Sequence, residues 1–224
     1  MQLETFSNSP FAYSDFVANF GNTYTYGTLQ GSWTRDSRDS LIMTTDGSLR
    51  RVSAETAAGG LQFYRLGYTQ QYYFPLSRRY TLFLNGDLGY AGGLGGKPLP
   101  FFKNYYAGGP GSVRGYRALS LGPLDPLGNA LGGNRRIVGS AEILFPVPGA
   151  DQDKSLRLGT FIDGGQVYSR EEKLSLAELR YSAGIALSWS SPFGPLRISL
   201  GWPLNEKKGI DRVQRLQLTI GTGF

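Results

Sequence analysis

The amino-acid sequence predicts an all-β fold, a transmembrane antiparallel β-barrel, and three observations lead to that prediction. The 224 residues include 32 Gly, 14 Tyr and 13 Phe, a composition that favours strands and turns over helices. Apolar and polar residues alternate over about nine segments of roughly 9 to 12 residues, the length that a tilted strand needs to cross a membrane. No stretch approaches the roughly 18 consecutive apolar residues of a membrane helix. The chain is therefore expected to cross the membrane with strands.

The composition also excludes most enzymatic chemistry. The chain has no Cys and no His, so it has no disulfide, thiol nucleophile, Cys/His zinc site, Ser-His-Asp triad or histidine general base. The loop carboxylates lack the spacing of a calcium site. We therefore expect no enzyme, no catalytic residue, no metal and no cofactor.

The predicted strands follow an N-terminal stretch, residues 1–23, that is expected to be a terminal segment or loop. This stretch has neither the basic opening nor the apolar centre of a signal peptide. The strands are predicted at about residues 24–35, 48–59, 64–72, 80–90, 137–145, 156–163, 179–189, 196–202 and 214–224. Short connections at 74–77 and 192–195 suit the periplasmic side, whereas the longest connection, about 91–135, suits the outside.

The last predicted strand shows the alternation most clearly. Its apolar parity contains Leu216, Leu218, Ile220 and Phe224, and its other parity contains Arg215, Gln217, Thr219, Gly221 and Gly223. Because successive side chains of a strand point to opposite faces, one face is apolar and the other is polar or small. A barrel in lipid has this division, with apolar residues outside and polar residues towards the lumen.

A soluble β-sandwich also alternates, and it is the alternative to the barrel. Two details favour the membrane. The polar faces mix small residues with charges, as in Arg180, Ser182 and Gly184, which is typical of a lumen lining. Tyr and Trp recur near the strand ends, for example at Trp33 and Trp202, as in the aromatic girdles at a membrane interface.

Arg114 is the residue of interest in the long loop, because it follows a glycine-rich turn flanked by tyrosines. By parity, Glu142 and Asp163 point into the lumen from two neighbouring predicted strands. A guanidinium offers such carboxylates a bidentate fork. We expect Arg114 to fold into the lumen and pair with them. A solvated loop arginine is the alternative that spacing alone leaves open.

Two short motifs make the chain recognisable. They are Val113, Arg114, Gly115 and Tyr116 in the loop, and Phe161, Asp163 and Gly165 in a later strand. The first resembles the loop motif, and the second the companion strand motif, of the BamA family of outer-membrane assembly factors (the bacterial surface antigen family). The resemblance covers about residues 24–224 and implies that Arg114 contacts Asp163 and the interior Glu142.

The same resemblance implies a larger barrel. Family members have a signal peptide, periplasmic POTRA domains and sixteen strands, so residues 24–224 are expected to be the C-terminal portion, about nine strands, of such a barrel. Nine strands alone would leave two unpaired edges. A small self-closed barrel that recruits the N-terminal segment as a further strand is the alternative.

The function implied by the resemblance is to fold and insert client outer-membrane proteins through a lateral gate between the first and last strands. The gate strand here contains Leu216, Leu218, Ile220, Gly221, Gly223 and Phe224. The two glycines weaken its end, which suits a gate, although ordinary lumen-facing glycines explain them equally. The location implied is the bacterial outer membrane. The implied partners are outer-membrane lipids and lipopolysaccharide, unfolded clients and, through the periplasmic domains, accessory lipoproteins. No nucleic acid is expected.

Two other functions compete with client insertion. One is a pore of the two-partner secretion type, which shares both motifs and moves a polypeptide through the lumen. The other is a structural barrel fragment without independent activity. Nucleotide binding is excluded, because the glycine-rich stretch before Lys97 lacks the first Gly and the final Ser/Thr of a phosphate-binding loop.

Overall fold

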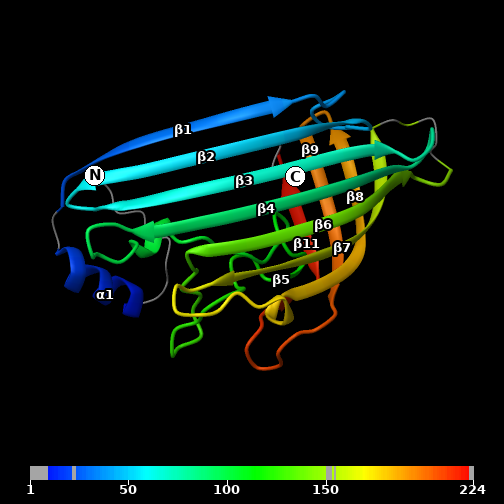
Figure 1. Ribbon diagram of the computed structural model, residues 1–224. Coiled ribbons are helices and arrows are strands. Elements are labelled where there is room, and N and C mark those ends of the chain that lie inside the picture. Colours follow the sequence, from blue (N-terminus) through cyan, green and yellow to red (C-terminus); the bar gives the residue numbers. More distant parts are fainter. Residues whose placement is uncertain (1–9, 22–23, 150–152, 154, 222–224) are drawn as a thin grey trace.

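A computed structural model of the chain describes residues 10–21, 24–149, 153 and 155–221, and confirms the predicted antiparallel β fold (Figure 1). One nine-stranded antiparallel sheet has the order β1-β2-β3-β4-β6-β7-β8-β9-β11, and β5 and β10 form a separate pair. The elements are α1 (Pro10–Phe20), β1 (Tyr26–Asp36), β2 (Gly47–Gly59), β3 (Phe63–Pro75), β4 (Thr81–Gly93), η1 (Phe101–Lys103), β5 (Gly115–Tyr116), β6 (Arg135–Pro146), β7 (Leu156–Tyr168), η2 (Leu176–Glu178), β8 (Arg180–Ser191), β9 (Gly194–Pro203), β10 (Val213–Gln214) and β11 (Leu216–Ile220).

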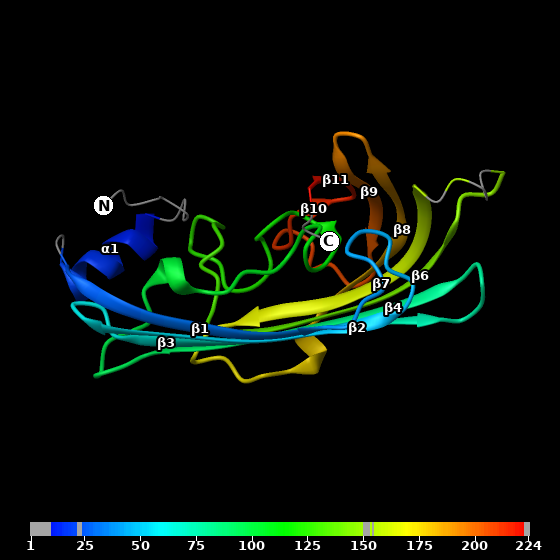
Figure 2. The ribbon, with the colours of Figure 1, turned by 90° about the horizontal axis from the view of Figure 1, so that it is seen from above.

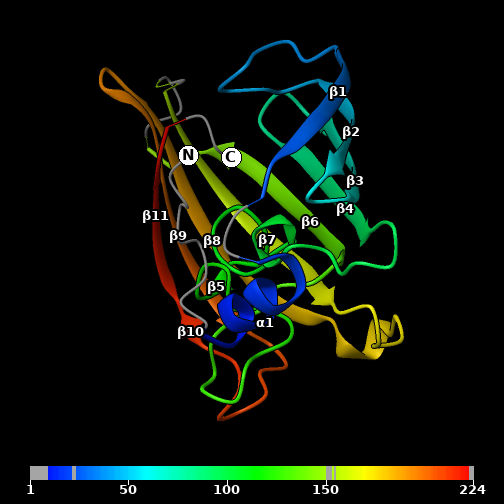
Figure 3. The same ribbon diagram turned by 90° about the vertical axis from the view of Figure 1, so that its left-hand side faces the viewer.

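The sheet is strongly curved (Figures 2 and 3). The exposure of its side chains shows that its two faces differ in polarity. In β11, Leu216 and Leu218 are 65% and 60% exposed on the convex face, whereas Gln217 is buried on the concave face. In β8, likewise, Ile185 is exposed on the convex face and Ser182 is fully buried on the concave face. A water-soluble protein rarely exposes so continuous an apolar surface. The arrangement is the one expected when the convex face meets lipid and the concave face lines a lumen.

The sheet is open, with β1 and β11 as its two edges. The small self-closed barrel is therefore not formed. Residues 10–20, which were expected to be loop or a further strand, instead form α1. The helix differs from the prediction because Phe16 is packed by Phe101 and Phe102, residues far along the chain, and such contacts are not visible in the local sequence.

Helix α1 covers one end of the concave face (Figure 3). Its Phe16 is 4% exposed and packs against Tyr24, Phe101 and Phe102, with ring centroids 5.4, 5.6 and 5.5 Å away. Edge-to-face aromatic pairs of this kind stabilise packing beyond the area that they bury. The helix thus ties the N-terminal side of the sheet to the start of the long loop. No helix within the described ranges is long and apolar enough to cross a membrane.

The connection between β1 and β2, residues 37–46, folds across the concave face at the opposite end (Figure 2). Its Thr44 is 3% exposed, and the Thr44 hydroxyl donates to Ser40 O at 2.6 Å. Arg157 at the start of β7 donates to the backbone oxygens of Thr44 and Met43 at 2.6 and 3.2 Å. This turn therefore reaches past β3, β4 and β6 and is held by β7.

The longest connection, between β4 and β6, comprises residues 94–134. It is slightly shorter than the predicted 91–135, because β4 continues to Gly93, where the backbone of β3 is still available for pairing. Short connections, 76–80 and 192–193, lie at the end away from this loop. The longest connection and the two predicted short ones thus lie at opposite ends, as in outer-membrane barrels, although the short connection 60–62 shares the end of the long loop and the ten-residue connection 37–46 lies at the other end.

Candidate functional site

The loop of residues 94–134 is a folded element on the concave side of the sheet (Figure 2). Its strand β5 pairs with β10, in the segment that leads into β11. Isolated bridges between Tyr105 and Gly133 and between Ala107 and Leu121 close the rest of the loop. The loop therefore holds its tip in a fixed place against the sheet.

Glycines allow the loop to approach the sheet closely. Gly115 has φ +88°, a conformation that favours glycine. A Cβ at Gly115 would lie 3.1 Å from the backbone of Gly201 in β9, and a Cβ at Gly201 would lie 2.8 Å from the nitrogen of Gly115. A side chain at either position would push the loop off β9.

Arg114 lies at this contact and points at two carboxylates of the sheet. Its Nε and Nη2 donate to the two oxygens of Asp163 at 2.7 Å each, and its backbone N–H donates to Asp163 Oδ2 at 3.0 Å. Its Nη1 donates to Glu142 Oε2 at 2.8 Å. The side chains of Arg114, Asp163 and Glu142 are 6%, 0% and 1% exposed. The structure thus brings together the three residues that parity and the paired motifs placed in the lumen.

Two further side chains complete the charge network. Ser140 accepts from Arg114 Nη2 at 3.1 Å and donates to Asp163 Oδ1 at 2.6 Å. Arg197 of β9 donates to both oxygens of Glu142. Two guanidiniums therefore face two carboxylates, so the buried charges balance. Burial alone would lower the pKa of Arg114, but the hydrogen bonds and charges of Asp163 and Glu142 outweigh burial and raise that pKa.

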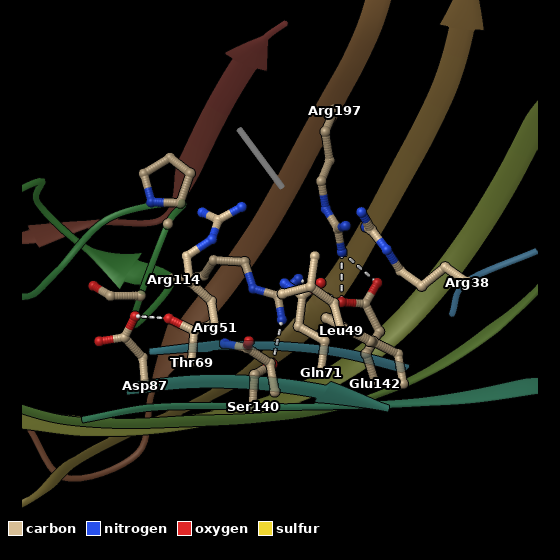
Figure 4. Close-up of a pocket in the computed structure, with 15 residues that line it drawn as sticks. Arg38, Leu49, Arg51, Thr69, Gln71, Asp87, Arg114, Ser140, Glu142 and Arg197 are labelled. Carbon is tan, nitrogen blue, oxygen red and sulfur yellow. Dashed lines mark hydrogen bonds and ion pairs between the residues drawn. The ribbon is translucent and has the colours of Figure 1, made fainter. Parts of the chain in front are cut away.

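The network borders a cavity of about 300 Å³ on the concave side, shown in Figure 4. Arg114, Ser140, Glu142 and Arg197 converge along one wall of this cavity, and Arg51 lies on the β2 side. Within the described ranges no group of His, Cys, Asp and Glu has the arrangement of a metal site. The network can fix the loop against the sheet.

The strand motif forms the floor under the loop motif. The ring of Phe161 lies under the Arg114 guanidinium, 3.4 Å from its Cζ to the ring centroid, a cation–π contact. Gly165 makes room for Val113, because a Cβ at Gly165 would lie 2.9 Å from Val113 Cγ2. Val113 is fully buried in a cluster with Ala107, Tyr116, Leu121, Val138 and Val167.

Tyr116 links the loop motif to the last strand. Its ring is fully buried, its hydroxyl donates to Tyr181 O at 3.3 Å, and its carbonyl accepts from Gln217 Nε2 of β11 at 2.6 Å. Burial raises the pKa of the Tyr116 hydroxyl to about 12. The loop therefore holds β11 by a side-chain bond as well as by the pairing of β5 with β10.

Comparisons with known proteins identify the family. The Omp85 superfamily domain matches residues 2–224. The chain belongs to the Omp85 superfamily. The outer membrane protein assembly factor BamA of Neisseria meningitidis serogroup B is 39% identical over 263 residues, which cover 100% of this chain and 33% of that protein. BamA of Nitratidesulfovibrio vulgaris is 29% identical over 86% of this chain and 25% of its own length.

A solved structure supports the same assignment. The crystal structure of BamA from Haemophilus ducreyi lacking POTRA domains 1–3 matches with a TM-score of 0.78 and 28% identity, over 86% of this chain and 41% of that chain. The Omp85 chain described here thus spans between a quarter and two fifths of the length of these relatives. The predicted family and barrel fold are confirmed, and the chain is a protein of the bacterial outer membrane.

The residues predicted for the gate strand of this Omp85 chain are partly described. Leu216, Leu218 and Ile220 point outwards from β11 and are 65%, 60% and 69% exposed. Gly221 directly follows β11 with φ +98°. Gly223 and Phe224 lie outside the described residues.

Sequence reasoning missed three members of the site: Ser140, Arg197 and Gln217. Each shares the lumen parity of its strand, since Ser140 alternates with the apolar Ala141, Arg197 with Ile198 and Gln217 with Leu218. The alternation of each strand therefore indicated that these three side chains face the lumen. It did not signal how far along the lumen each would lie, because that depends on strand register and on where the loop docks.

Proposed function

We propose that this chain forms the C-terminal part of an assembly factor that folds and inserts client outer-membrane β-barrel proteins, and that it acts without covalent catalysis. On this proposal residues 24–224 belong to a sixteen-strand barrel and residues 1–23 precede its strands. The observation that carries the proposal is the free edge of β11 at the end of a membrane sheet. The BamA relatives, which are assembly factors by name, support it.

The backbone groups available at this edge follow from the hydrogen bonds on either side of β11. Gly201 N donates to Arg215 O at 2.9 Å, and Gly221 N donates to Pro195 O at 2.8 Å. Residues of an antiparallel pair alternate between bonding their direct partner and pointing away from it. Residues 215, 217, 219 and 221 therefore bond towards β9. The N–H and C=O groups of Leu216, Leu218 and Ile220 point to the free edge.

An unfolded client strand needs hydrogen-bond partners for its own backbone N–H and C=O groups. Each unpaired N–H or C=O costs several kcal/mol in hydrocarbon, and an exposed strand edge satisfies them by β-augmentation. β11 thus offers a client a template at membrane depth. In the complete barrel this edge would be one side of a lateral gate, and the first strand would be the other side.

The shortness of β11 suits a gate that opens. β11 has five residues, Leu216–Ile220, whereas its partner β9 has ten, Gly194–Pro203. Gly221, which still donates to Pro195 O, then takes up a conformation with φ +98° that departs from extended strand geometry. Meanwhile Gln217 keeps the strand attached to Tyr116 of the loop. On this proposal the loop retains β11, while the outer edge of β11 changes its pairing partner from the first strand to the client.

A proline substitution tests the edge directly. Leu218→Pro in the complete protein removes an outward N–H, spares the ladder to β9 and is tolerated at an edge. Leu218→Ala is the matched control, because it shortens the side chain and keeps the N–H. We expect Leu218→Pro to abolish client folding in liposomes and rescue of depleted cells, while the barrel itself stays heat-modifiable. Equal activity of the two folded variants would refute the role of the edge.

The secretion-pore alternative shares both motifs, so the same loop and buried network on the concave side are compatible with either function. The BamA relatives, which are assembly factors by name, favour insertion at the edge. Single-channel conductance separates the two functions: a secretion pore conducts steadily, and an assembly factor of the proposed kind stays mostly closed. Contacts with lipopolysaccharide, and with accessory lipoproteins through periplasmic domains, belong to the same proposal.

A further inference from the structure

Two arginines face outwards on the apolar convex face of the sheet. Arg35 of β1 lies directly opposite Arg50 of β2, and Arg50 lies directly opposite Gln70 of β3. Their face is set by alternation, because Trp33 and Val52, two positions away on the same strands, are 54% and 44% exposed on the convex side. A row of two guanidiniums and an amide thus interrupts the lipid-facing surface.

The charges of this row are unmatched by acids of β1 to β4. Asp36, Glu55 and Asp87 belong to the opposite, concave parity. Among the described residues, Glu55 pairs with Arg65 and Lys103 there. Like charges directly opposite each other are destabilising, and an arginine on the lipid face costs stability that grows with depth. An anion between the two guanidiniums would remove both penalties.

The neighbouring side chains hold Arg50 in a fixed orientation. Gln70 Nε2 donates to Leu49 O at 3.1 Å, which turns Gln70 Oε1 towards Arg50 Nε at 2.8 Å. The Tyr68 hydroxyl donates to the same oxygen at 3.0 Å. Arg50 Nη2 reaches the Tyr72 hydroxyl at 3.5 Å. The outer N–H groups of this guanidinium remain available to a ligand. The side chain of Arg35 makes no hydrogen bond or ion pair within the described ranges.

The row lies near the membrane interface at the end with the short connections. Arg35 is the next-to-last residue of β1, and Arg50 is the fourth residue of β2. Exposed Trp33 and Phe74 of the same face flank the row, as aromatic side chains do at the level of the headgroups. The short connections predict that this end is the periplasmic one, and on that orientation the adjoining leaflet consists of glycerophospholipids.

We propose that Arg35 and Arg50 form a binding site for the phosphate of an anionic glycerophospholipid such as phosphatidylglycerol. The two guanidiniums supply forked donors to the phosphate oxygens, and the Tyr72 hydroxyl borders the site. The proposal rests on the orientation that the connection lengths predict, with the short connections at the periplasmic side, and on the barrel of the proposed function, but it does not depend on client insertion.

Trp33 provides the probe, because it is the neighbour of Arg35 on the same face. The complete protein is placed in vesicles that contain brominated phosphatidylglycerol or brominated phosphatidylcholine. The quenching of Trp33 fluorescence is obtained by subtracting the quenching measured for the Trp33→Phe variant from that measured for the unaltered protein. We expect about a fivefold preference for phosphatidylglycerol for each arginine that contributes, and we expect high salt to weaken it.

The matched variants separate a site from general attraction. Arg35→Gln and Arg50→Gln should each remove most of the preference. Arg51→Gln makes the same charge change one residue along β2, on the concave face, and should leave the preference intact. No preference in the unaltered protein, or equal losses in Arg50→Gln and Arg51→Gln, would overturn the proposal. Client folding by Arg50→Gln is measured separately, so failure of the lipid site and failure of the proposed function remain distinct.

Discussion

Arg114→Ala is the most informative perturbation of the lumen. It removes both side-chain hydrogen bonds of Arg114 to the Asp163 carboxylate and its ion pair with Glu142. Both carboxylates are almost fully buried. The substitution therefore leaves buried charges without a partner instead of deleting a surface contact.

The size of the effect follows from what each carboxylate retains. Glu142 keeps Arg197. Asp163 keeps two uncharged donors, the Ser140 hydroxyl at 2.6 Å and the backbone N–H of residue 114 at 3.0 Å. Breaking a buried ion pair costs about 3–5 kcal/mol. Because these partners remain, we expect about 3 kcal/mol of lost unfolding free energy, at the lower end of that range.

The assay is urea unfolding of the complete protein in detergent micelles, followed by heat-modifiability on gels. Arg117→Ala is the control, because Arg117 is an exposed arginine three residues along the same loop, and its truncation should change stability by less than about 0.5 kcal/mol. Combining Arg114→Ala with Asp163→Asn should cost less than the two single changes together, since the neutral amide no longer needs a cation. A loss below about 0.5 kcal/mol for Arg114→Ala, or additive costs, would refute the reasoning.

Two more predictions concern the packing around Glu142 and the buried tyrosine of the loop. Gly159→Ala should destabilise the protein by about 1–3 kcal/mol, because a Cβ there overlaps Glu142 Oε1; Gly86→Ala has open space around it and should be near neutral in the same urea titration. Burial raises the pKa of Tyr116 to about 12, so the protonated form is favoured by folding. Its contribution should be complete below pH 10 and be lost as the pH rises from about 10 to 12. Tyr116→Phe should flatten that part of the stability–pH curve, and an unchanged curve would contradict the assignment.

The fold was predictable because alternation is a local property. Each strand shows its apolar face in its own sequence, as the outward Leu216 and Leu218 of β11 illustrate. Helix α1 was missed because its stability comes from Phe101 and Phe102, residues far along the chain that pack on Phe16. Tertiary packing of this kind outweighs local propensity.

The site was predictable in part for the same reason. The alternation of the strands predicted that Glu142 and Asp163 point into the lumen, and the loop motif predicted that Arg114 points towards them. The glycine contacts between Gly115 and Gly201 were beyond reach, because they depend on which strand meets the loop. The fold of residues 37–46 onto Arg157 depends likewise on the curvature of the whole sheet.

That fold of residues 37–46 has a mechanical consequence. A curved sheet can change its curvature, but a contact that bridges two separated strands on its concave face resists that change between them. The bonds from Arg157 to Thr44 and Met43 join the β1–β2 turn to β7 and so bridge β3, β4 and β6 on the concave face. Strands β8, β9 and β11 continue the sheet beyond this bridge. We therefore expect the wall to change its curvature more easily from β8 to β11 than between β2 and β7.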